Sequence, residues 1–88
     1  MDSTALVIAA RNGDRAAGER LAAQYLPLVY NVVGRALNGH PDVDDVVQET
    51  MLRALSGLPS LRDPARFRSW LVAIAMNLFS YWNSDRMV

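Results

Sequence analysis

The 88-residue chain has no cysteine, no lysine and a single histidine, His40. The lack of cysteine excludes disulfides and any metal or redox site built on thiolates. No apolar run approaches the ~18 residues that a membrane span requires, and the first residues do not resemble a signal peptide. We therefore expect a cytoplasmic protein that has no contact with a membrane.

The common catalytic motifs are also missing. The sequence contains no Gly-rich phosphate loop, no HExxH zinc motif and no nucleophile elbow. His40 lies in a predicted turn, without an acid–base partner or ligand spacing in the sequence. Asp42, Asp44 and Asp45 lie at a predicted helix start, where negative charge is favourable in itself. We expect no enzyme, no cofactor and no bound metal.

The net charge is zero, because nine arginines balance nine acidic residues. A protein that binds DNA alone through its phosphates is normally strongly basic, so the charge argues against that class. The hydrophobic fraction of 51% is typical of a globular chain. A chain of this length buries only about 60–65% of its unfolded surface, so it forms one domain with a modest core.

The hydrophobic pattern has helical spacing, and no useful stretch alternates with the period of two residues typical of strands. We predict an all-α fold, a compact bundle of three main helices in one domain, residues 1–88. The first main helix should be broken near Pro27, because proline lacks an N–H and disfavours helix at the residue before it. The expected helices span about 4–11, 15–25, 27–38, 42–56 and 64–83.

Cap residues define several of these helix ends. Ser3, Asp14 and Asp63 are suitable N-caps, and Pro64 suits the first position of the last helix. Tyrosine side chains at 25 and 30 are expected at the core edge, with hydroxyls that reach water. The buried stripe of the last helix should contain Phe67, Trp70, Leu71, Ile74, Ala75, Leu78 and either Tyr81 or Trp82.

The chain is organised around residues 42–55, which form an amphipathic pattern. Its apolar side has the i, i+3, i+4, i+8 spacing of one helix face and contains Val43, Val46, Val47, Met51, Ala54 and Leu55. Its polar side contains Asp42, Asp45, Gln48, Glu49 and Arg53. Taken alone, this polar side is a solvated helix face.

This helix resembles the second conserved region of bacterial sigma factors of the extracytoplasmic-function (ECF) group. The family pattern is close to D-x-x-D-[LV]-[VT]-Q-E-[TV]-[FM]-[LI]-[RK]-[AV], and residues 42–54 follow it. A second block, FRSWLVAIAMN at residues 67–77, is similar to the family's F-[RK]-x-W-L-x-x-I-A-x-N. A weaker similarity extends back to about Asp14.

The resemblance implies two binding surfaces. In the family, the organising helix docks on the coiled-coil clamp helices of the RNA polymerase β′ subunit, which implies polymerase binding by Asp42, Asp45, Gln48, Glu49 and Arg53. Met51 and Leu55 would add apolar contact at the rim. The loop 58–63 and the last helix would bind the melted non-template strand of the minus-ten promoter element. The implied DNA-binding residues are Ser60, Leu61, Arg62, Arg66, Ser69, Met76, Asn77 and Ser80.

The chain departs from the family pattern at several positions. Many members have Arg at Met76, Asp near Tyr81 and a basic run after the last helix, where this chain has only Arg86. The family's second DNA-binding module is not within the 88 residues, so we expect an excised domain or a truncated protein. An anti-sigma factor is the regulatory partner that the resemblance implies. One alternative is a decoy that binds polymerase or an anti-sigma factor without recognising a promoter; another is an unrelated helical bundle.

Overall fold

Four α-helices and two short 3₁₀ turns follow one another in a computed structural model that describes residues 3–86, with side chains for residues 3–82. The elements are α1 (Thr4–Arg11), α2 (Arg15–Ala36), α3 (Val43–Gly57), η1 (Leu58–Ser60), η2 (Pro64–Arg66) and α4 (Phe67–Arg86). Residues 3–86 contain no strand, so the predicted all-α class is confirmed.

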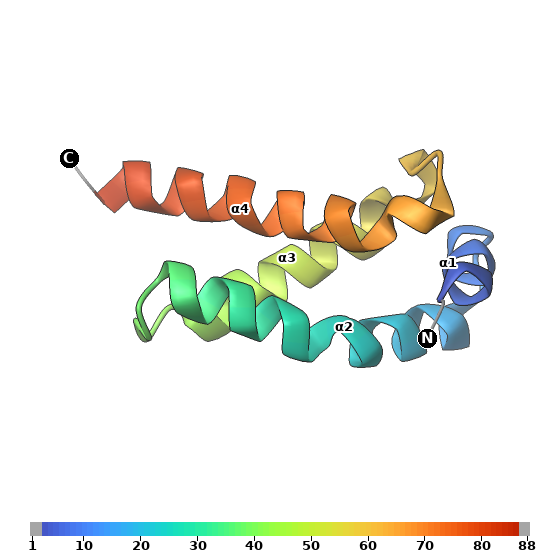
Figure 1. The fold of residues 1–88 in the computed structure, drawn as a ribbon, viewed down its shortest axis with the longest axis horizontal. Coiled ribbons are helices and arrows are strands. Elements are labelled where there is room, and N and C mark those ends of the chain that lie inside the picture. Colours follow the sequence, from blue (N-terminus) through green and yellow to red (C-terminus); the bar gives the residue numbers. More distant parts are fainter. Residues whose placement is uncertain (1–2, 87–88) are drawn as a thin grey trace.

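The three long helices form an elongated bundle with extents of 41 × 21 × 19 Å. In Figure 1, α2 and α4 run along the long axis, α3 crosses between them, and α1 lies at one end. At that end, Arg11 of α1 donates from Nη1 to the carbonyl oxygen of Leu61 at 3.1 Å. This hydrogen bond joins α1 to the loop between α3 and α4.

The α2 helix is continuous over 22 residues, so the predicted break near Pro27 is wrong. Pro27 has no N–H to donate to the carbonyl of Ala23, four residues earlier. Both residues are exposed, so water can bond that carbonyl instead. Leu21 and Val29, on either side of the proline, are buried in the same core, and their packing holds both halves in one helix.

Most other helix ends lie close to their predicted positions. Asp14 and Asp63 act as side-chain caps, each accepting a 3.0 Å hydrogen bond from a backbone N–H. Pro64 opens the short turn η2 rather than α4 itself. The α2 helix ends two residues earlier than predicted, and Asn38 and Gly39 then adopt positive φ angles of 53° and 72°. This left-handed turn leads the chain into α3.

The hydroxyl groups of two tyrosines bond within the protein, rather than only to water as predicted. Ser3 makes no capping bond with its side chain; its Oγ instead lies 2.7 Å from the Tyr25 hydroxyl. The Tyr25 ring meets Phe67 edge-on, with 5.0 Å between the ring centroids. The Tyr30 hydroxyl donates to Asp44 Oδ1 at 2.8 Å. These contacts fix α2 against α1, α3 and α4.

The core lies where the three long helices meet. On α4, Trp82 is half-buried whereas Tyr81 is 77% exposed, so Trp82 completes the inward stripe of this helix. Thr50 is fully buried, and its hydroxyl donates to the carbonyl of Val46 at 2.7 Å. The largest fully buried apolar side chains are Phe67, Leu21, Leu58, Leu71, Val7, Val29, Val33 and Val47.

Candidate functional site

The start of α3 is strongly acidic. Four carboxylates occur within eight positions, at Asp42, Asp44, Asp45 and Glu49. Asp44 and Asp45 lie in the first turn, where the helix dipole favours negative charge. Arg53 is the single cation of this helix, and its Nε donates to Glu49 Oε2 at 3.0 Å. The exposed end of α3 therefore presents negative charge to a partner.

The five residues predicted to bind polymerase border three different hollows along α3. Asp42, Asp45 and Glu49 line a hollow between α3 and the end of α4. Arg53 lines a second hollow between the same two helices. Gln48 lies at the α2 side of the exposed arc of α3, along a groove shared with α2. The sequence placed all five on the polar side of the helix but did not show which of them border α2 and which border α4.

Asp42 is engaged inside the protein. Its Oδ2 accepts a 2.9 Å hydrogen bond from Trp82 Nε1, and its backbone N–H donates to His40 Nδ1 at 3.0 Å. The His40 ring meets Trp82 edge-on, with 5.1 Å between the ring centroids. This cluster ties the beginning of α3 to the end of α4, so His40 does more than occupy a turn.

A groove of about 410 Å³ between α2 and α3 carries the exposed apolar residues of this side. Leu52 is 65% exposed, and Leu26 and Tyr30 are each 39% exposed. Met51 is only 8% exposed and packs in the core, but it also lines this groove, so its apolar contact at the rim stays a prediction. Leu55 lines the same groove, and its contact at the rim likewise stays a prediction. The sequence analysis missed Leu52, although it lies four residues after Gln48 and so on the same side of the helix.

The predicted DNA-binding residues are exposed with one exception. Leu61 is 6% exposed and its side chain packs in the core, so this side chain is not part of the exposed surface on which the prediction placed it. It follows η1, whose turn directs it inward beside Leu58. The other seven are exposed: Ser60, Arg62, Arg66, Ser69, Met76, Asn77 and Ser80.

The beginning of α4 is basic, in contrast to the beginning of α3. Arg62, Arg66 and Arg68 are all exposed. Asp63 offsets part of this charge, since its Oδ2 lies 3.6 Å from Arg66 Nε. Arg68 was not among the predicted residues, although its position next to Phe67 placed it in the same basic segment. The zero net charge therefore conceals a local acidic region with four of the nine acids and a local basic region with three of the nine arginines.

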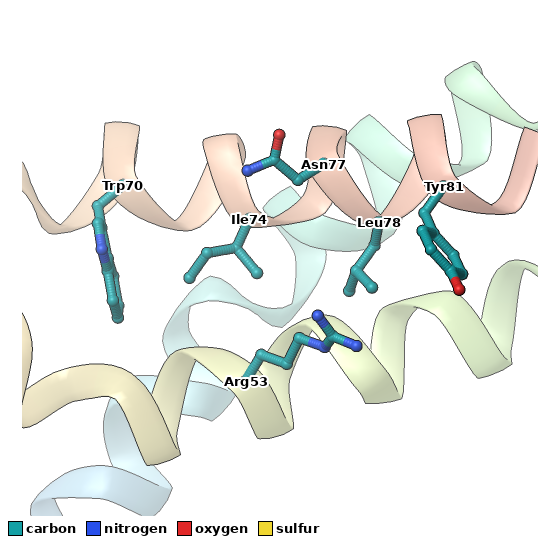
Figure 2. Close-up of a pocket in the computed structure, with 6 residues that line it drawn as sticks. All are labelled: Arg53, Trp70, Ile74, Asn77, Leu78 and Tyr81. Carbon is teal, nitrogen blue, oxygen red and sulfur yellow. The ribbon is translucent and has the colours of Figure 1, made fainter. Parts of the chain in front are cut away.

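A hollow of about 620 Å³ lies between α3 and α4. Figure 2 shows that most of its lining side chains descend from α4 towards α3, while the Arg53 side chain rises to meet them. The lining residues are Arg53, Trp70, Ile74, Asn77, Leu78 and Tyr81. Sequence reasoning placed Asn77 at a binding surface but treated Trp70 as core and left Tyr81 undecided.

Within the part of the chain that the structure describes, no three His, Cys, Asp or Glu side chains form a group that could hold a metal ion. None of the helices, over the same part of the chain, is both long enough and apolar enough to cross a membrane.

A family model matches most of the chain. The family model Sigma-70 region 2 matches residues 21–86, so the chain belongs to this family. Its relatives place it more narrowly, as a region 2 domain of the ECF group. It is 38% identical to the ECF RNA polymerase sigma-E factor of Escherichia coli (strain K12) over 72 residues, 82% of this chain and 37% of that protein.

Further similarities support the same assignment. The chain is 34% identical over 64 residues to the RNA polymerase sigma factor YlaC of Bacillus subtilis (strain 168), covering 73% of this chain and 37% of that protein. The fold is similar to the NMR structure of an engineered region 2 of sigmaE in complex with GTAAAA. That similarity has a TM-score of 0.84 and 31% identity, and it covers 98% of this chain and 90% of the other. The chain spans little more than a third of the curated relatives that it matches.

Proposed function

We propose that this domain acts in transcription initiation by binding core RNA polymerase through α3 and the melted minus-ten strand through the α3–α4 loop and α4. One observation supports this most: the fold is similar, over 98% of the chain, to a sigmaE region 2 solved with the hexanucleotide GTAAAA. The polymerase would perform the chemistry, so the domain itself is no enzyme. It would act in the cytoplasm, and an anti-sigma factor could regulate it by covering the same surfaces.

The exposed side of α3 suits a coiled coil that carries arginines. Asp45 and Glu49 are exposed carboxylates one turn apart, and charge-assisted hydrogen bonds from arginine to carboxylate are among the stronger polar contacts. Gln48 and Leu52 extend this surface towards α2. Leu52 supplies the apolar side chain that a partner can desolvate, whereas the surrounding charges set register and association rate.

The loop and α4 suit a single DNA strand. Arg62, Arg66 and Arg68 are exposed and can contact phosphates, which position a strand. The Asn77 amide can both donate to and accept from a base edge. A base removed from the duplex costs a few kcal/mol, so the protein must hold it in a site of its own. The short loop before α4, with prolines at 59 and 64, is a restrained element on which to build that site.

The first test compares Glu49→Lys with wild type in binding to a fragment of the β′ clamp helices. Because the substitution reverses a charge that would face arginine, we expect affinity to fall about tenfold or more, or about 1.4 kcal/mol. Loss of the exposed pair with Arg53 changes stability by only ~0.5 kcal/mol, so the variant should stay folded by circular dichroism. Glu19→Lys, an exposed position on α2, is the control with the same change of charge.

Three outcomes are informative. Equal affinity of wild type and a folded Glu49→Lys would remove α3 from the polymerase role. Glu49→Lys should not lose affinity for GTAAAA, because the carboxylate that it removes belongs to the polymerase surface. A wild type that binds the clamp fragment but no single strand would favour the alternative of a decoy without promoter recognition.

A further inference from the structure

The loop between α3 and α4, residues 58–63, carries part of the proposed DNA surface. Its second half, residues 61–63, belongs to no helix. Ser60 and Arg62 are exposed, whereas the Leu61 side chain between them is buried in the core. Leu61 fixes the position of the loop, but a single buried side chain does not orient the peptide groups on either side of it. The direction of the exposed side chains must therefore come from another contact.

Arg11, at the end of α1, supplies that contact from 50 positions before Leu61. Figure 1 shows α1 beside this loop at one end of the bundle. The Nη1 group of Arg11 donates to the carbonyl oxygen of Leu61 at 3.1 Å and to that of Arg62 at 3.4 Å. No backbone N–H of the described residues bonds either carbonyl. These carbonyls belong to the two peptide units that flank Arg62, so Arg11 fixes the direction in which the Arg62 side chain leaves the loop.

The helix that carries Arg11 is itself held firmly. Val7, one turn before Arg11, is fully buried in the core. At the other end of α1, Ser3 Oγ lies 2.7 Å from the hydroxyl of Tyr25 on α2. Directly after α1, the Asp14 side chain caps the next helix. Arg11 therefore reaches the loop from an element whose position is fixed by packing and not by the loop.

We propose that Arg11 is a positioning residue for promoter-strand recognition, which holds the loop backbone in the shape that receives a base and does not contact the strand. This rests on the proposed function, in which the α3–α4 loop binds DNA. A loop that is ordered before binding loses less conformational entropy when the strand binds. Arginine suits this task because its planar guanidinium presents several donors in a fixed geometry and stays charged.

The geometry favours this role over a direct contact between Arg11 and a phosphate. Arg11 is only half-exposed, and its Nη1 is directed at the loop carbonyls. Arg62 and Arg66 are fully in the exposed class and remain the cations that a strand meets first. A strand that bound Arg11 directly would have to compete with the two carbonyls for the same donor.

The test measures binding of the complete 88-residue chain to GTAAAA and to strands in which each base of GTAAAA is replaced in turn. Disorder of the loop in Arg11→Ala should weaken GTAAAA binding by about 2- to 10-fold. At one base position, the preference that wild type shows for the original base should fall towards one. Partial unfolding cannot produce this result, because it weakens binding to every strand by the same factor.

Two further variants separate positioning from charge. Arg11→Lys keeps the charge but not the planar fork, so it should recover only part of the lost base preference. Arg20→Ala removes an exposed arginine from α2, and it should bind every strand as wild type does. Circular dichroism confirms that each variant is folded.

The order of the loop is measured without DNA by NMR relaxation of the backbone amides at residues 60–63. Order parameters should be about 0.85 in wild type and should fall towards about 0.6 in Arg11→Ala. Because Arg11 contacts no phosphate in this proposal, the slope of log affinity against log salt should be the same in wild type and Arg11→Ala.

The possible results separate this proposal from the proposed function. Equal base preferences, or an equally ordered loop, in wild type and Arg11→Ala would overturn the proposal and leave promoter-strand binding intact. A salt slope less steep by about 0.7 in Arg11→Ala would make Arg11 a phosphate contact and would also overturn it. If wild type binds neither GTAAAA nor any strand with a replaced base, the DNA part of the proposed function fails, and this proposal fails with it.

Discussion

Three aspartates at the start of α3 have different roles although they are neighbours in sequence. Asp42 accepts a hydrogen bond from Trp82, Asp44 accepts one from Tyr30, and Asp45 is exposed. The sequence identified all three as the acidic start of a helix. It could not identify the partners of Asp42 and Asp44, because these lie 40 and 14 positions away and meet α3 only after the helices pack. The sequence therefore predicted the acidic character of these side chains but not the hydrogen bonds that they make.

The contact between Tyr30 and Asp44 predicts a measurable titration. The hydrogen bond to the Asp44 carboxylate, together with partial desolvation and the negative charge of Asp44, raises the pKa of Tyr30 above its ordinary value of 10.0. Asp44→Ala removes both the acceptor and the charge, so the pKa of Tyr30 should fall towards 10.0. An NMR titration of the Tyr30 ring carbons measures this change.

The same contact has a defined effect on stability. A pKa raised in the folded state means that the hydrogen bond stabilises the protein fully below the ordinary pKa of tyrosine and is lost as the pH rises through the raised value. Wild type should therefore lose this contribution only in the alkaline range, and Tyr30→Phe should lack that dependence. A Tyr30 pKa that is unchanged by Asp44→Ala would contradict the assignment of its cause.

Helices were predictable as elements because their signals are local. Caps at Asp14 and Asp63 and the periodic apolar stripes placed most helix ends within two residues. The predicted break at Pro27 was wrong for a physical reason. The prediction considered only the one backbone hydrogen bond that proline cannot make, whereas the burial of Leu21 and Val29 stabilises the helix on both sides of it. The rotation of each helix about its axis was also beyond the sequence, which is why the polar pattern did not show that Gln48 borders α2 while Arg53 borders α4.

Replacing Pro27 tests how the α2 helix tolerates its missing hydrogen bond. Pro27→Ala restores an N–H that can donate to the carbonyl of Ala23, and it also makes the unfolded chain more flexible. The first effect stabilises by up to about 3 kcal/mol and the second destabilises by up to about 1 kcal/mol. We expect the free energy of unfolding to rise by about 1–2 kcal/mol, with a melting temperature higher by about 4–8 °C per kcal/mol.

The control for this substitution lies in the same helix. Gln24→Ala is an exposed change that alters no backbone hydrogen bond, and it should shift stability by about 0.5 kcal/mol or less. Chemical denaturation of the three proteins measures the difference. A Pro27→Ala variant no more stable than wild type would mean that the helix accommodates the proline without strain.

For the whole molecule, the distribution of charge over the surface says more about DNA binding than the net charge does. The zero net charge argued against binding through phosphates, yet four of the nine acids lie at the start of α3 and three of the nine arginines lie at and just before the start of α4. Acidic and basic segments were visible in the sequence, at residues 42–49 and 62–68. Their separation on the surface depends on the packing of α3 and α4, and the inward position of Leu61 likewise appeared only in the fold.

This separation predicts a salt dependence that net charge alone would not. Each phosphate contact contributes about −0.7 to the slope of log affinity against log salt for a single strand. If Arg62, Arg66 and Arg68 each contact one phosphate, GTAAAA binding should have a slope of about −2 between about 50 and 200 mM salt. Arg66→Ala should make that slope less steep by about 0.7, whereas Arg35→Ala, at the end of α2, should leave it unchanged. Titrations at four salt concentrations measure each slope. Equal slopes for wild type and Arg66→Ala would show that the strand does not follow the basic start of α4, and would leave its affinity to stacking and base contacts further along the helix.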